Sequence, residues 1–215
     1  MKLVRFALIL LPLSGLAASG AFAQQSMQPA ESDGAEMHMH HMHEAGPAIT
    51  YAEMKDTVTR LDEARRATEK YRDVRVATAD GYQAIGPDVP GMGIHYVRRT
   101  GPDRFDLERP QILLYEKDAS AAGGYALVGV SYLLKAASGE DGQPMDPPFP
   151  KSLAKWHRHE NICVLPDNST PAGLTDEQCT ARGGHFTAET QWMIHAWIWK
   201  ESPNGVFSAT NPTVQ

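Results

Sequence analysis

Residues 110–135 read PQILLYEKDASAAGGYALVGVSYLLK, and two apolar, β-rich runs stand out within them. Ile112 to Tyr115 lie in the first run, and Leu127 to Leu133 lie in the second. The connection carries Gly123 and Gly124, residues typical of turns. Two such runs joined by a glycine-containing connection predict a β-hairpin.

A helix is predicted before this hairpin. Thr50 and Glu53 form the T-x-x-E pattern of a capping box, which marks a helix N-terminus. Apolar side chains then recur at helical spacing, with charged residues between them. This pattern predicts one helix that ends near Ala79, where Gly81 stops it, and whose apolar stripe faces the core. The stripe consists of Tyr51, Met54, Val58, Leu61, Ala64, Thr68, Tyr71 and Val74.

Two further segments are expected to be strands. Trp156 to Cys163 runs into an apolar, β-rich stretch, and Trp192 to Trp199 is rich in aromatic and β-branched residues. As a strand, the second segment places Met193, His195, Trp197 and Trp199 on one face. The sequence therefore predicts an α+β domain, in which a long N-terminal helix packs on an antiparallel sheet that could curl into a half-barrel.

A His-x-His pair is the most informative feature for function. His157 and His159 stand two residues apart at the start of an expected strand. Alternate side chains of a strand share a face, so the two Cβ atoms would lie about 7 Å apart. Both imidazoles could then turn onto one metal ion, whereas a helix would splay them apart.

Two more histidines complete a candidate cluster. His95 follows a loop with Gly91 and Gly93, where the backbone can approach closely, and His195 lies in the last expected strand. Together with His157 and His159 they could hold Zn, Cu, Ni or Fe. Three ligands and an open position would permit metal-assisted chemistry, and four would make a closed binding site. Ordinary histidines bonded to nearby carbonyls remain the alternative.

The expected surroundings of this cluster follow from strand alternation. Asn161 would share the face of the His-x-His pair and could orient one ring, whereas Glu160 would point away. Glu116 is a possible carboxylate partner from the neighbouring strand. Three tryptophans would wall the site and keep it dry, or else would pack a core. These are Trp156, Trp197 and Trp199.

A second group of metal-ligand residues lies nearer the N-terminus. Residues 24–48 form a polar segment that cannot build a core and is predicted to be a disordered tail. It holds the alternating run Met37 to His43, and imidazole with thioether is a ligand set that suits copper. The candidate ligands are His38, His40, His41 and His43. A solvated tail with chance bias, or an expression tag, is the alternative.

The first 23 residues predict export. Lys2 and Arg5 precede a short apolar run that ends in the A-x-A cleavage pattern Ala21 to Ala23. This indicates a signal peptide over residues 1–23, and the run is too short and interrupted to span a membrane. A single domain over residues 49–215 and a periplasmic or secreted location are expected.

The cysteine content agrees with export, and the net charge limits the possible partners. Cys163 and Cys179 are the two cysteines, and in an exported protein an even count predicts a disulfide. Metal ligation by these thiols is the alternative, but their spacing fits no common C-x-x-C pattern. The formal net charge of −6 argues against nucleic acid or an anionic membrane as the partner.

Several segments together resemble a family of exported bacterial proteins. They are Gly91-Met92-Gly93-Ile94-His95-Tyr96, Trp156-His157-Arg158-His159-Glu160-Asn161-Ile162-Cys163 and His195-Ala196-Trp197-Ile198-Trp199. The likeness covers roughly residues 52–212. It implies the exported setting and the single-domain boundary, and it implies no activity.

These observations favour a periplasmic protein that binds a transition metal, copper or zinc and more specifically copper. The tail would capture the ion and the folded histidines would hold it. One rival is a metalloenzyme with Zn or Cu at three histidines beside a tryptophan-lined pocket. The other is a module without metal that binds a small molecule or an envelope protein. Whether the protein is an enzyme stays open at this point.

Overall fold

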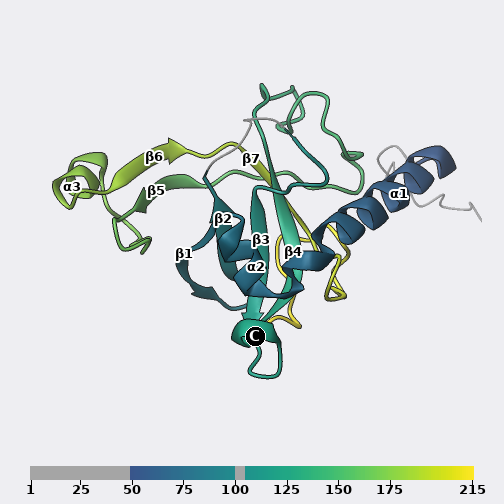
Figure 1. Cartoon of the computed structure of the whole chain (residues 1–215). Helices are drawn as coiled ribbons and strands as arrows, with labels where there is room; N and C mark the ends of the chain where they lie inside the picture. Colours follow the sequence, from purple (N-terminus) through teal and green to yellow (C-terminus); the bar gives the residue numbers. More distant parts are fainter. Residues whose placement is uncertain (1–48, 100–104) are drawn as a thin grey trace, which may run out of the picture. The chain divides into compact units, whose positions relative to one another are not determined.

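The computed structural model describes residues 49–99 and 105–215. The predicted signal peptide and the tail with its Met/His run lie outside the described residues. Within the described ranges, the chain forms helices and two antiparallel sheets, which Figure 1 labels in sequence order. None of the helices in these ranges is long and apolar enough to cross a membrane.

The first helix is shorter than the sequence predicts. The capping box of Thr50 and Glu53 starts α1 (Tyr51–Thr68), as expected. The helix then gives way to the 3-10 turn η1 (Glu69–Arg72), and a separate α2 (Val74–Ala79) follows. The prediction of one helix to Ala79 is therefore wrong.

The break has a physical cause in the core. The hydroxyl of the buried Tyr115 donates a hydrogen bond of 2.5 Å to the backbone carbonyl of Tyr71, just before the break. Asp73 then takes an extended backbone and accepts a hydrogen bond from the Arg75 amide, so that it caps α2. A tertiary contact thus replaces continuation of the helix.

Only the second half of the predicted apolar stripe reaches the core. Ala64 and Tyr71 are buried, but Tyr51 is 85% exposed and Val58 is 50% exposed. The first half of α1 therefore presents its apolar side chains to solvent, contrary to the expectation of one continuous buried face.

The main sheet is antiparallel and open, in the order β1-β2-β3-β4-β7. Its strands are β1 (Tyr82–Val89), β2 (Gly93–Arg98), β3 (Ile112–Lys117), β4 (Tyr125–Leu134) and β7 (Trp192–Ala196). The predicted hairpin is the β3–β4 pair, connected through the 3-10 turn η2 (Ala122–Gly124). The α+β architecture predicted from the sequence is confirmed.

Two apolar clusters divide the side chains of this sheet. Alternate residues of β3 go to different clusters, as do alternate residues of β7, so the clusters lie on opposite faces. The larger one, the main core, includes Tyr71, Tyr82, Tyr115, Tyr132, Phe149 and Ile194. The smaller one, the second cluster, consists of Ile112, Leu114, Val128, Met193, Trp197 and Val214.

A small second sheet carries the disulfide. It pairs β5 (Glu160–Val164) with β6 (His185–Glu189), and α3 (Asp176–Ala181) packs on both strands, at the left of Figure 1. The predicted bond between Cys163 and Cys179 is present, with an S–S distance of 2.02 Å. It links cysteines with a sequence separation of 16 and joins β5 to α3.

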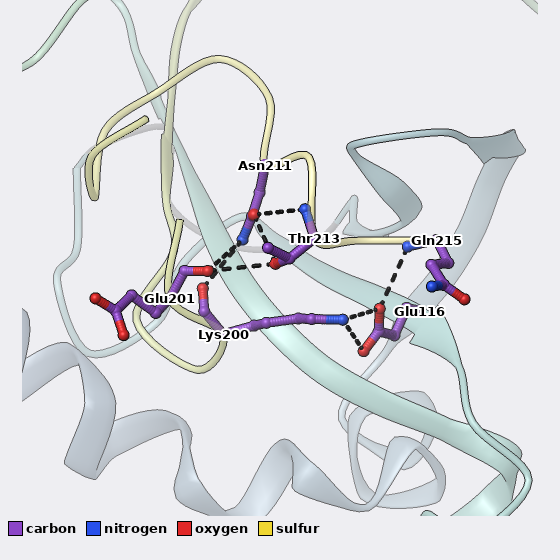
Figure 2. A network of polar contacts seen from close by, with 6 residues as sticks. All are labelled: Glu116, Lys200, Glu201, Asn211, Thr213 and Gln215. Carbon is purple, nitrogen blue, oxygen red and sulfur yellow. Dashed lines mark hydrogen bonds and ion pairs between the residues drawn. The ribbon is translucent and has the colours of Figure 1, made fainter. Parts of the chain in front are cut away.

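Residues 202–215, the C-terminal segment, have no regular structure and are held by polar contacts (Figure 2). The buried Asn211 amide donates to the carbonyls of Lys200 (3.1 Å) and Glu201 (3.2 Å). Its oxygen accepts from the amide and hydroxyl of Thr213. The Lys200 ammonium pairs with Glu116 on β3 at 2.6 Å, so the segment is anchored to the sheet.

Asn211→Ala tests this anchor. The substitution removes the hydrogen bonds that the buried Asn211 side chain makes to Lys200, Glu201 and Thr213, so we expect the free energy of unfolding to fall by about 2–3 kcal/mol. Chemical denaturation of the variant and the wild type measures the loss. Asn204→Ala, at an exposed position of the same segment, is the matched control and should change stability by less than about 0.5 kcal/mol. Equal stabilities of the two variants would refute the role of Asn211.

Candidate metal centre

The four histidines predicted to cluster lie on one side of the main sheet. His95 is on β2 and His195 is on β7. His157 forms an isolated antiparallel bridge with Met193 of β7, and His159 follows it. The predicted tail ligands His38, His40, His41 and His43 lie outside the described residues.

The segment that carries the His-x-His pair is not a regular strand, which corrects the prediction. The His157 amide donates to the Met193 carbonyl (3.0 Å), and the Met193 amide donates back (2.7 Å). The His159 carbonyl accepts from the Thr190 amide (2.9 Å), and its amide donates to the Thr190 hydroxyl (2.9 Å). Regular pairing begins only with β5. These four bonds still hold the segment extended beside β7.

The rings of the four histidines are neighbours. Ring centres lie 5.7 Å apart for His95 and His195, 5.3 Å for His157 and His195, and 5.2 Å for His157 and His159. Electrostatic coupling between His95 and His159 joins the two ends of this row. The four histidines that the sequence predicted to lie together are neighbours in the structure, and we call them the histidine cluster.

His195 is held in a defined tautomer. Its Nδ1 lies 2.7 Å from the carbonyl oxygen of Ala209, which can only accept, so Nδ1 carries the proton. The other ring nitrogen, Nε2, is buried and has no hydrogen-bond partner among the described residues. A histidine that donates one N–H to a backbone carbonyl and keeps the other nitrogen free has the arrangement common to metal ligands.

His157 offers a second free nitrogen. Its Nδ1 is buried and has no partner with hydrogen-bond geometry in the described part of the chain, although the backbone of Lys155 lies close enough to the ring to oppose the lowering of its pKa. Buried polar atoms are nearly always hydrogen-bonded, and each exception calls for an explanation. Other buried atoms of the described residues, such as Ser131 Oγ and Trp192 Nε1, also lack a partner, but His157 and His195 carry theirs on adjacent imidazole rings.

Burial keeps the four imidazoles neutral. It lowers the pKa of His195 to about 3 and that of His95 to about 4, and neighbouring histidines add to both shifts. Burial also lowers the pKa of His157 and His159, with His159 adding to the shift of His157. A low-polarity setting and mutual repulsion both disfavour the imidazolium form, so the rings retain lone pairs at neutral pH.

The rings do not form a finished coordination group. In residues 49–99 and 105–215, no three or more His, Cys, Asp or Glu side chains are arranged so that they could hold a metal ion. The rings adjoin, but a shared ion would require them to rotate about their side-chain bonds. His157 and His159 are only partly buried.

Two of the three polar residues predicted around the cluster are placed differently from the prediction. Asn161 has a left-handed backbone (φ 54°), which interrupts the alternation, and it lines a pocket beside α3 instead. Glu116 is paired with Lys200. Glu160 is exposed, as expected.

Only one of the three predicted tryptophans walls the cluster. Trp197 lies against His195, with ring centres 5.6 Å apart, and its indole N–H donates to the Ser208 carbonyl. Trp156 and Trp199 pack in or against the main core instead. Trp199 departs from the predicted face because β7 ends at Ala196 and the alternation ends with it.

A large cleft lies apart from the cluster. Its volume is about 830 Å³, and Trp199 and Lys200 line it with residues of α1, η1, β3 and β4. None of its lining residues is a histidine. Charged groups in its wall pair with one another, as in Lys200–Glu116 and Arg72–Glu69. The cleft beside Trp199 and the histidine cluster are thus separate sites.

Sequence reasoning missed the backbone partner of His195. The Ala209 carbonyl has no side-chain signature, and only the fold of residues 202–215 places it there. Backbone bonds from the same segment to Gly91, between Gly91 N–H and Val214 C=O and between Asn211 N–H and Gly91 C=O, fasten it close to β2.

The lowered pKa values predict an acid-sensitive fold in the metal-free protein. Below pH 6.5 the unfolded chain binds protons at His95 and His195 that the folded chain does not bind. The stabilisation that the folded chain gains at these two positions is therefore fully present above that pH. It should fall on acidification toward pH 4, by on the order of 1 kcal/mol per pH unit for each histidine.

Urea unfolding of chelator-treated protein measures this between about pH 7 and pH 5, above the range where most carboxyl groups titrate. His185→Gln, at an exposed histidine of β6, should leave the pH dependence unchanged. A wild-type stability that stays constant over this range would contradict the burial argument.

Comparison with known proteins adds no functional information. No family model, no curated protein and no solved structure matches this chain. The chemistry of the site must therefore be argued from its own residues.

Proposed function

We propose that this protein binds a transition-metal ion, copper, in the histidine cluster. One observation carries the proposal. Two adjacent imidazoles, His157 and His195, each hold a buried ring nitrogen without a partner among the described residues. A metal ion would satisfy both atoms at once, since a neutral imidazole nitrogen is a good ligand for copper and zinc.

The spacing of the rings supports this reading. A metal–nitrogen bond of about 2.0 Å places the centre of a bound imidazole about 3 Å from the ion, so two ligating rings have centres about 5–5.5 Å apart. The separations along the row are 5.2, 5.3 and 5.7 Å. Each pair of successive rings in the row is therefore at a separation that two ligands of one ion would have.

The protonation state supports it as well. Metal and proton compete for the same lone pair, so ligation by histidine normally weakens as pH falls toward 6.5. The lowered pKa values of the four rings remove this competition at neutral pH. The cluster would thus accept an ion without first releasing protons.

The Met/His run of residues 37–43 suggests copper as the ion, because thioether and imidazole together suit it. In this proposal the tail captures copper through many weak contacts and the folded cluster holds it more specifically. The disulfide and the signal-like first 23 residues suit a periplasmic or secreted protein that stores, delivers or detoxifies the ion.

A closed binding site is better supported than a metalloenzyme. An enzyme needs an open coordination position beside a pocket that accepts substrate. The tryptophan-lined cleft contains no histidine, so the two requirements are not met in one place.

The deciding experiment is a copper and zinc titration of the chain from Gln24 onward, purified without a histidine tag. The tail is silenced by replacing its four histidines with Ala and Met37, Met39 and Met42 with Leu. We expect one ion to bind per chain. His157→Ala and His159→Ala should each weaken binding at least about 100-fold, beyond the loss typical of residues that only support a ligand.

His185→Ala is the matched control, since it removes an exposed histidine outside the cluster. Near-ultraviolet circular dichroism checks that each variant is folded. If the tail-silenced chain binds no metal in stoichiometric amount, the proposed function is wrong. If it binds metal but both cluster variants bind equally well, the assignment of ligands is wrong.

A further inference from the structure

Met193 lies where a fifth donor could reach the histidine cluster. The paired backbone bonds between His157 and Met193 make them direct partners across an antiparallel bridge. Side chains of such partners point to the same face. Met193 also shares a face with His195, two residues along β7. The thioether and two cluster imidazoles therefore project to one side of the sheet.

Burial keeps this thioether away from water. Met193 is 7% exposed and belongs to the second cluster, with Leu114 and Trp197. Because Trp197 also contacts His195, the apolar cluster and the histidine cluster adjoin. A buried methionine is often simply a filler of core space. What distinguishes Met193 is its direct pairing with a histidine whose ring nitrogen has no partner.

Charge also distinguishes the histidine cluster. Burial is the largest cause of the lowered pKa of all four histidines, and no described carboxylate opposes it. Glu116 is committed to Lys200, and Glu160 is exposed. Imidazole and thioether are both neutral, so an ion bound here keeps its whole charge. The cost of burying an uncompensated charge rises steeply with its size, which favours a monovalent ion.

We propose that Met193 is a ligand of the cluster and that the site is selective for Cu(I) over Zn²⁺ and Cu²⁺. The inference rests on the proposed function and goes beyond it by naming the oxidation state and the residue that sets it. Thioether sulfur is a soft ligand that prefers Cu(I), whereas the divalent ions depend on the nitrogens. The neutral ligand set and the thioether thus act in the same direction.

Met193→Leu in the tail-silenced chain tests this inference, because the replacement nearly conserves volume in the core. Cu(I) affinity is measured without oxygen by competition with a chromophoric Cu(I) chelator, and Zn²⁺ affinity with a zinc indicator. The expected result is a loss of at least about tenfold for Cu(I), with the Zn²⁺ affinity changed less than about twofold. X-ray absorption of the Cu(I) form should show a copper–sulfur distance that the variant lacks.

Met145→Leu is the matched control, since Met145 is an exposed methionine in a loop. Unchanged Cu(I) affinity in Met193→Leu, or tighter binding of Zn²⁺ than of Cu(I) by the parent chain, would overturn the inference while leaving metal binding in place. Failure of the parent chain to bind any of these ions would overturn both proposals. A parallel loss for Cu(I) and Zn²⁺ would show that Met193 only supports the fold of the site.

Discussion

Strand β7 is buried along its whole length, and this burial constrains much of the molecule. Buried backbone N–H and C=O groups must find partners, because water cannot reach them. One side of β7 pairs with β4, and the bridge at Met193 brings the His157 segment to the other. Backbone carbonyls of residues 206–209 accept hydrogen bonds from three further donors at the end of β7. These donors are the Trp197 amide, the Trp197 indole and the His195 ring. The neighbours of the histidines are thus fixed by the need to cover one strand.

The sequence predicted elements well where the pattern is local. The β3–β4 hairpin, the helix start at Thr50 and the alternation of β7 up to Ala196 all follow from period and turn chemistry. The sequence failed to predict local structure where a group far away in the chain determines it. The break after α1 depends on a hydroxyl from β3, and the side on which Trp199 lies depends on where β7 ends. Neither effect can be recognised in the local sequence pattern.

The features of the candidate site likewise divide into those that the sequence predicted and those that it did not. Spacing and residue type identified the four histidines, because His-x-His in an extended segment places both rings on one face. They could not supply the burial that keeps the rings neutral or the carbonyl that fixes the tautomer of His195. Those depend on residues 202–215, which have turn-forming composition and no regular period. The residues of a site can be found from a sequence, but their protonation state is a property of the folded chain.

The histidines come from segments far apart along the chain, and this determines when in folding the cluster can form. His95 and His195 meet only after β2, β3, β4 and β7 have assembled, since two strands lie between them in the sheet. Contacts of such long sequence separation form late, because closing large loops costs entropy. An unfolded chain would therefore carry no cluster. Under the function proposed above, an ion could enter the cluster only after the chain has folded, so the ions present in the compartment of folding would compete for it.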